Sequence, residues 1–233
     1  MWKRHLSFSI SFGLIAILEL FAEILNISEV RLFTKPLICI VLSGYLISKT
    51  RLYGNFSKLI FAGLLFSLVG DIALLFAGRG ATYFIAGLSA FLVAHIFYAT
   101  AFFRDYRYDP AASKKHGHTM LFVLAIFTIS FYIFIRPYLL DMKIPVMAYI
   151  VVISIMAIMA GYRYERVNLL SFQLILAGAI LFIISDTLLA INKFVHPFLF
   201  SGVFIMATYM AAQFLITIGA LERIIFLKNK PYR

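Results

Sequence analysis

Four acidic side chains lie within long apolar stretches, where charge is costly: Glu19, Glu23, Asp71 and Asp186. The two aspartates end similar nine-residue segments, GLLFSLVGD and GAILFIISD, which are 115 residues apart. If two such carboxylates lie close together, their repulsion keeps a proton on one while the other ionises. An acid and a base side by side are used in glycoside hydrolysis, so this pair predicts acid–base chemistry.

The composition indicates that this chemistry takes place within a membrane. Of 233 residues, 63% are apolar and 13% are charged, with a mean hydropathy of +0.97. Average soluble domains are about 45–50% apolar and about 25% charged, and disordered chains are poorer still in apolar residues. The net charge of +11 is spread between apolar runs, so we expect no nucleic-acid partner. A lone cysteine, Cys39, excludes an internal disulfide and is interpreted as a small buried side chain.

Eight segments are long and apolar enough to cross a bilayer as helices. Their continuous apolar character excludes the alternating pattern of a membrane β-barrel. We therefore predict an all-α membrane protein with one integral membrane domain over residues 1–233. The expected spans are 6–25, 33–49, 57–77, 82–103, 119–140, 145–162, 169–191 and 197–222.

Basic residues predict the orientation of these spans. Fifteen of the basic residues fall at one set of span ends and six at the other. The positive-inside rule then places both termini in the cytoplasm, and in a bacterium the membrane would be the inner one. The first apolar stretch contains Glu19 and Glu23 and has no small-residue cleavage site, so we interpret it as a retained span.

The repeated aspartate motif suggests that the chain contains two copies of a four-helix unit. The same offset of 115 residues relates Gly87 to Gly202 and Tyr98 to Gln213. We predict one repeat over about residues 1–105 and another over about 117–227, both in the same orientation. Parallel repeats are related by an axis along the membrane normal, and sites form at their interface. Asp71 and Asp186 would then lie at equivalent depths in one pocket.

Further polar residues are expected near the aspartates, in the half of the bilayer opposite the basic ends. Each also has a structural interpretation, as a residue that reaches solvent, snorkels to the interface or bonds neighbouring helices. They are Glu19, Glu23, Lys35, His95, Tyr98, Tyr209 and Gln213. One histidine of five lies in a span, and no zinc-type histidine spacing occurs, so we expect neither a metal nor a cofactor.

The motifs, taken in order, resemble those of the YhhN family of lysoplasmalogenases, which are eight-span membrane hydrolases. The resemblance covers most of the chain, but not the C-terminal residues Phe226–Arg233. It rests on Thr34–Leu37, Phe66–Asp71, Gly87–Tyr98, Pro145, Tyr149–Met156, Ser185–Ala190 and Tyr209–Gln213.

The resemblance implies metal-independent hydrolysis of the vinyl ether bond of a lysoplasmalogen. The products would be a fatty aldehyde and a glycerophospho-ethanolamine or -choline. Asp71 and Asp186 are the implied catalytic residues, with the acid and the base unassigned. The implied supporting or substrate-binding residues are Glu19, Lys35, His95, Tyr149, Ser185, Tyr209 and Gln213. Lys35 would attract the phosphate of the lysophospholipid.

Two other functional classes stay open at this point. A small transporter or proton-coupled carrier would also use carboxylates within the membrane and internal repeats. Its helices would be broken by Gly or Pro at equivalent depths, whereas Gly70 corresponds to Ser185, and Pro36 and Pro145 open their spans. A non-catalytic lipid-binding protein would leave the paired aspartates unexplained. The oligomeric state is not predicted.

Overall fold

The structure, a computed structural model, describes residues 2–225 as a bundle of antiparallel helices. It confirms an all-helical protein with eight helices long and apolar enough to span a membrane. These are α1 (Trp2–Ile24), α2 (Ser28–Thr50), α3 (Asn55–Leu75), α4 (Ala81–Tyr108), α5 (Lys115–Ile135), α6 (Lys143–Gly161), α7 (Leu169–Ala190) and α8 (Ser201–Leu221). The predicted basic tail from residue 226 onward lies outside the described residues.

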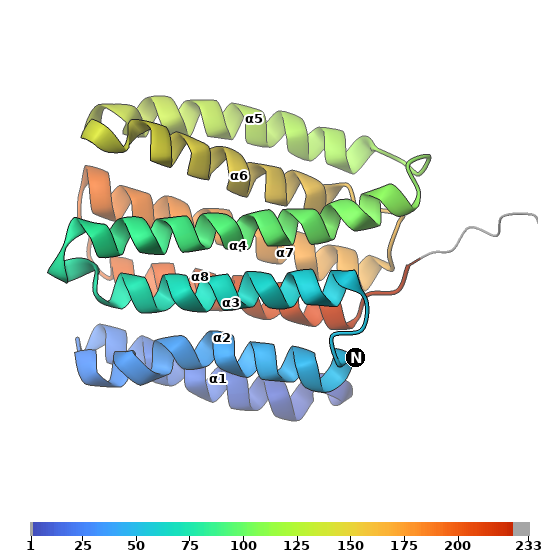
Figure 1. Cartoon of the computed structure of the whole chain (residues 1–233), viewed down its shortest axis with the longest axis horizontal. Helices are drawn as coiled ribbons and strands as arrows, with labels where there is room; N and C mark the ends of the chain where they lie inside the picture. The colour runs from blue at the N-terminus through green and yellow to red at the C-terminus, as the bar shows by residue number, and fades with distance from the viewer. Residues whose placement is uncertain (1, 226–233) are drawn as a thin grey trace, which may run out of the picture.

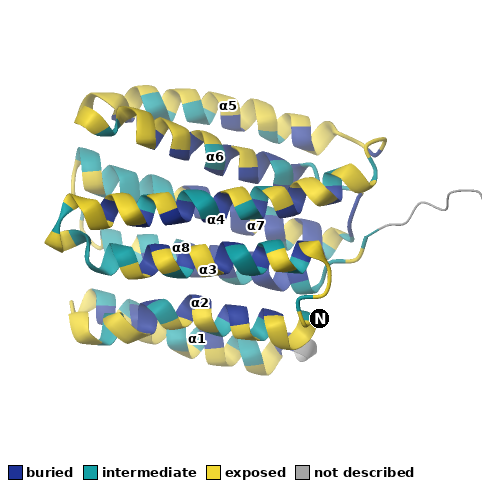
Figure 2. Ribbon diagram, in the orientation of Figure 1, coloured by how far each residue is buried: buried dark blue, intermediate teal, exposed yellow. Residues whose placement is uncertain are grey.

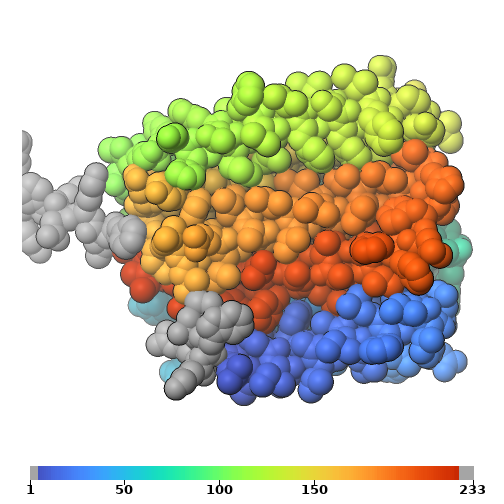
Figure 3. All heavy atoms as spheres, turned by 180° about the vertical axis from the view of Figure 1, so that it is seen from behind, coloured from blue at the N-terminus to red at the C-terminus, as the bar shows by residue number. Residues whose placement is uncertain are grey.

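Four helices form the centre of the bundle. Figure 1 shows α1 and α2 at one edge and α5 and α6 at the opposite edge, with α3, α4, α7 and α8 between them. From behind, α5, α7, α8 and α1 follow one another across the molecule (Figure 3). The N-terminus and the end of α8 lie at one end, called here the terminal end; the loops α1–α2, α3–α4, α5–α6 and α7–α8 lie at the other, the distal end.

Large apolar side chains cover the outside of the helices, as expected where lipid is the solvent. Exposed examples include Leu14, Phe33, Phe122 and Ile133, all on the outer faces of peripheral helices. Figure 2 shows that α5 is largely exposed and that α4 carries a long buried stripe, and α6 and α8 likewise have many buried residues. Most of the polar residues named above lie on inward faces of the helices, away from this apolar surface.

Glycines allow the central helices to pack closely in pairs. A Cβ atom at Gly178 on α7 would lie 2.9 Å from the carbonyl oxygen of Ala212 on α8. At Gly63 on α3, the ring of Tyr98 on α4 fills the space of the missing side chain. Small residues at such contacts let membrane helices approach closely, which is how α3 packs on α4 and α7 on α8.

The boundaries of α2 and α4 extend beyond the predicted spans. Helix α2 begins at Ser28, so Pro36 lies inside it and does not open the span. Helix α4 continues to Tyr108, so the expected 104–118 loop is reduced to residues 109–114. The guanidinium of Arg166 holds this connection, donating to the carbonyl oxygens of Asp109, Ala112 and Ser113 at 2.9–3.1 Å.

The close contact at Gly178 predicts a clear effect of one added methyl group. Gly178→Ala should lower the free energy of unfolding by about 1–3 kcal/mol, because the backbone of α8 cannot move aside cheaply. Gly44→Ala is the matched control, since nothing lies within 4 Å of its Cβ position on α2. Thermal unfolding in detergent measures both. A Gly178→Ala protein as stable as Gly44→Ala would contradict this account of the α7–α8 contact.

Candidate active site

Asp186 on α7 is held by two side chains from other helices. The hydroxyl of Tyr149 on α6 donates to Asp186 Oδ2 at 2.5 Å. The Nε2 atom of His95 on α4 lies 3.2 Å from the same oxygen and 3.0 Å from the Tyr149 hydroxyl. Both contacts involve Oδ2, so Oδ1 is the oxygen of Asp186 left for another molecule.

The surroundings of His95 favour one arrangement of its ring protons. The Nδ1 atom is buried and has no hydrogen-bond partner within residues 2–225. Burying an N–H group there without an acceptor would cost more free energy than burying a ring nitrogen that carries no hydrogen. The hydrogen therefore belongs on Nε2, where it can be donated to Asp186 and hold the carboxylate in place.

Asp186 opens onto a narrow apolar cavity between α4, α5, α6 and α7. About 40 Å³ of it is open to water-sized molecules. Its wall includes Asp186, Tyr149 and a set of large apolar side chains, among them Phe84, Phe127, Phe131 and Phe194. The side chain of Asp186 is 14% exposed, so this carboxylate is accessible from the cavity.

Asp71 on α3 sits in a separate and fully enclosed cluster. The hydroxyl of Tyr209 on α8 donates to Asp71 Oδ2 at 2.6 Å. Gln213 Nε2 donates to the Tyr209 oxygen at 3.3 Å, and the Tyr98 hydroxyl donates to Gln213 Oε1 at 2.8 Å. Asp71 is 1% exposed, so the surrounding protein shields this carboxylate from water.

Aromatic rings separate the two aspartate clusters. Phe182 packs edge-on against both His95 and Tyr209, with ring centroids 4.6 and 5.5 Å apart, and it is fully buried. Asp71 is not among the residues that line the cavity at Asp186. The expectation of one pocket shared by both carboxylates is therefore not met, because Phe182 fills the space between their partners.

Glu19 belongs to a third polar cluster, which joins α1 to α2. Its carboxylate accepts a hydrogen bond from Thr34, and Arg31 Nε lies 3.8 Å from it. Arg31 also pairs with Glu23, whose carboxylate occupies the space beside Gly202. Glu23 is thus held at the distal end, away from both aspartates.

Lys35 is buried and does not snorkel to the surface. It is 7% exposed, and its charge acts on both Glu19 and Asp71. This position connects the Glu19 cluster to the Asp71 cluster and makes the ammonium a counter-charge for two buried carboxylates. Burial also separates Lys35 from solvent, so it is poorly placed to attract a lipid phosphate.

Ser185 and Cys39 make contacts that were not predicted from the sequence. The hydroxyl of Ser185 donates to the carbonyl oxygen of Ile205 at 3.0 Å. This hydrogen bond connects α7 to α8 and does not involve the carboxylate of Asp186. Cys39 is buried as expected, but its sulfur lies 3.5 Å from Asp71 Oδ2 and 3.2 Å from the Tyr209 oxygen. The sequence signal for this contact was the position of Cys39, which lies four residues after Lys35 and therefore on the same helix face.

The predicted repeats give a simple reason why each aspartate contacts a side chain from the other half of the chain. Each aspartate is held by a side chain from the last helix of the other half, His95 on α4 or Tyr209 on α8. Tyr98 and Gln213, which bond each other directly, are separated by the same 115 residues as the aspartates. Equivalent positions meet only near the axis that relates two copies. The two-repeat organisation stays a prediction, and this contact is consistent with it.

Sequence comparison decides the family. The profile of the YhhN family matches residues 30–220, which is most of the chain. The chain belongs to the YhhN family. The matched region includes Asp71, Asp186 and their direct partners, whereas Glu19 and Glu23 lie before it. The two aspartate clusters therefore lie within the region that the family profile matches.

Curated proteins related to this YhhN-family chain carry one activity in their names. Lysoplasmalogenase TMEM86A from Homo sapiens is 36% identical over 167 residues, covering 70% of this chain and 65% of its own length. Lysoplasmalogenase TMEM86B from Homo sapiens is 30% identical over 195 residues, covering 80% and 73%. The chain thus matches slightly less than two thirds of TMEM86A. No solved structure gives a significant match.

The hydrogen bond from Tyr209 predicts a loss of stability when it is removed. Tyr209→Phe leaves the enclosed Asp71 without its shortest donor, at a cost of about 1–3 kcal/mol. Tyr83→Phe is the control, because it removes the same hydroxyl group from a side chain on α4 that is 45% exposed. Thermal unfolding of the two variants in detergent compares them. Equal melting temperatures would show that Asp71 does not depend on Tyr209.

Proposed function

We propose that this YhhN-family protein is a lysoplasmalogenase, a hydrolase that cleaves the vinyl ether bond of a lysoplasmalogen. The observation that carries the proposal is Asp186, held by Tyr149 and His95 and open to an apolar cavity. The names of the related human proteins support the substrate class. The membrane supplies the lysophospholipid directly to such a site.

The cavity suits the alkenyl chain of a single-chain lipid. Its lining is almost wholly apolar, and Phe127 and Phe131 on α5 form part of one wall. Helix α5 has few buried residues and packs mainly on α6, at the edge of the bundle. A lipid chain entering past α5 would place its vinyl ether against Asp186 while its tail remains among phenylalanine rings.

The chemistry needs one proton donor and one site that stabilises positive charge. Protonation of the β-carbon of the vinyl ether gives an oxocarbenium ion, to which water adds. The resulting hemiacetal breaks its carbon–oxygen bond to release a fatty aldehyde and the glycerophospho-alcohol. One water is consumed. The protonated carboxyl group gives its proton to carbon and recovers a proton from the added water, so it ends in its protonated starting form.

The two aspartates fit unequal roles in this sequence of steps. Asp186, through Oδ1, is the group that reaches the substrate, so we assign it proton transfer to carbon and from water. Asp71 lies behind Phe182 with Lys35 and Tyr209, and we assign it an electrostatic role: its charge favours the nearby cation in a medium of low polarity. Tyr149 and His95 position Asp186.

Aldehyde release tests the proposal directly. The purified protein in detergent should release fatty aldehyde from a lysoplasmalogen without added metal. Asp186→Asn should lower the rate by about 100-fold or more, because the amide cannot transfer the proton. Asp71→Asn should also lower it. The rate is followed by trapping the aldehyde, and thermal unfolding checks that each variant is folded.

Asp141→Asn is the control, because Asp141 is exposed in the loop between α5 and α6 at the distal end. It should keep the wild-type rate. Full activity of both Asp71→Asn and Asp186→Asn would overturn the two-aspartate mechanism. No aldehyde release by the wild-type protein, together with uptake of the lipid into vesicles, would favour the carrier alternative.

The orientation in the membrane is part of the proposal. We infer that both termini are cytoplasmic, since the terminal end of the bundle carries most of the basic residues. An impermeant maleimide added to intact cells should label Arg79→Cys and leave Lys114→Cys unlabelled until the cells are opened. Native Cys39 is buried and serves as the unlabelled background. The reverse pattern would place the site in the other leaflet.

A further inference from the structure

A second cavity lies at the terminal end of the bundle, far from Asp186. It has a volume of about 660 Å³ and is bordered by the start of α3 and the ends of α4 and α8. Three arginines line it: Arg104, Arg107 and Arg223. Arg104 and Arg107 are three apart on α4 and both exposed, so they present their charges on one helix face.

The wall of this cavity contains a buried cluster with excess positive charge. Asp105, which is fully buried, accepts from Arg163 Nε at 2.9 Å and from Arg223 Nε at 2.8 Å. Two guanidinium groups thus share one carboxylate. Burial lowers the pKa of Arg163 from its ordinary value, and the neighbouring Arg223 lowers it further, while Asp105 opposes both effects. Removing charges from water is expensive unless they are balanced.

The aromatic ring beside Arg223 does not cancel this charge. The guanidinium of Arg223 lies 4.0 Å from the centre of the Phe56 ring, which stabilises the cation without neutralising it. An anion in the cavity would supply the missing charge.

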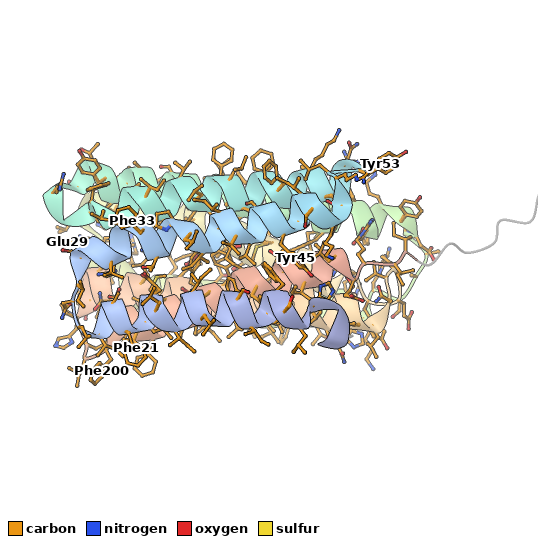
Figure 4. All side chains as sticks on the ribbon, turned by 90° about the horizontal axis from the view of Figure 1, so that it is seen from below. Phe21, Glu29, Phe33, Tyr45, Tyr53 and Phe200 are labelled. Carbon is orange, nitrogen blue, oxygen red and sulfur yellow. The ribbon has the colours of Figure 1, made fainter. Side chains whose placement is uncertain are left out.

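We propose that this cavity binds the phosphate group of an anionic phospholipid, held by Arg104, Arg107 and Arg223. Arginine offers several N–H donors in a planar fork that matches phosphate oxygens. The cavity is also bordered by Tyr53, Phe103 and Tyr108, which are exposed aromatic residues of the kind found at membrane interfaces. Figure 4 shows Tyr53 at the end of the bundle opposite Glu29 and Phe200.

The position of the cavity favours a lipid over a soluble anion. It opens at the level where the spans end, so a lipid headgroup in that leaflet can enter it while the acyl chains stay along α3 and α4. This site shares no lining residue with the Asp186 cavity, and it does not depend on the proposed hydrolase activity.

Lipid binding to the full-length protein tests the proposal. Native mass spectrometry in detergent should show one phosphatidylglycerol retained about tenfold more tightly than phosphatidylcholine. Arg104→Gln combined with Arg107→Gln should reduce the affinity for phosphatidylglycerol by about tenfold, because two of three charged contacts are lost. Arg163 and Arg223 are left unchanged, since Asp105 needs them for folding.

The control removes the same two charges from the same end of the bundle. Lys114→Gln with Lys115→Gln changes exposed residues beside α5, outside the cavity, and should leave the affinity unchanged. Equal loss in both double variants would overturn the proposal in favour of general surface attraction. Displacement of phosphatidylglycerol by inorganic phosphate at equal concentration would overturn the lipid assignment. Unchanged affinity in the arginine variant would overturn the site itself.

Discussion

A carboxylate among apolar helices must be given polar partners, and this requirement organises the interior of the bundle. Asp186 has Tyr149 and His95, Asp71 has Tyr209 and the charge of Lys35, and Asp105 has two arginines. Each of these sets joins at least two helices, or a helix and the segments that follow other helices. The contacts that satisfy the carboxylates are therefore also contacts that fix how the helices sit against one another.

The two aspartates with similar sequence motifs end in different environments. Asp71 is enclosed by Tyr209, Cys39 and the ring of Phe182, whereas Asp186 keeps one oxygen toward a cavity. Two carboxyl groups in identical surroundings would not determine which of them donates the proton. The difference in access gives the proposed hydrolase one carboxylate that meets the substrate and another that acts through its charge.

The number and approximate extent of the helices were predictable, because about 20 apolar residues are needed to cross a bilayer wherever they occur. Boundaries were less predictable where polar residues continue a helix. Arg104, Asp105 and Arg107 look like the start of a loop in sequence, yet α4 continues through them because Asp105 finds Arg163 and Arg223. Likewise, Arg163 and Arg166 belong to the fifteen basic residues that predict the orientation of the spans, and the sequence did not indicate that both are buried.

The sequence by itself determined that this is a helical membrane protein, that two aspartates with matching motifs lie within its spans, and that its motifs resemble the YhhN family. Hydropathy and local spacing carry that information because they act along one segment at a time. Only the tertiary structure decided which side chains meet: that Phe182 separates the aspartates, that Lys35 is buried, and that Asp186 alone of the two lines the cavity. Those outcomes depend on how side chains from different helices fill a shared interior.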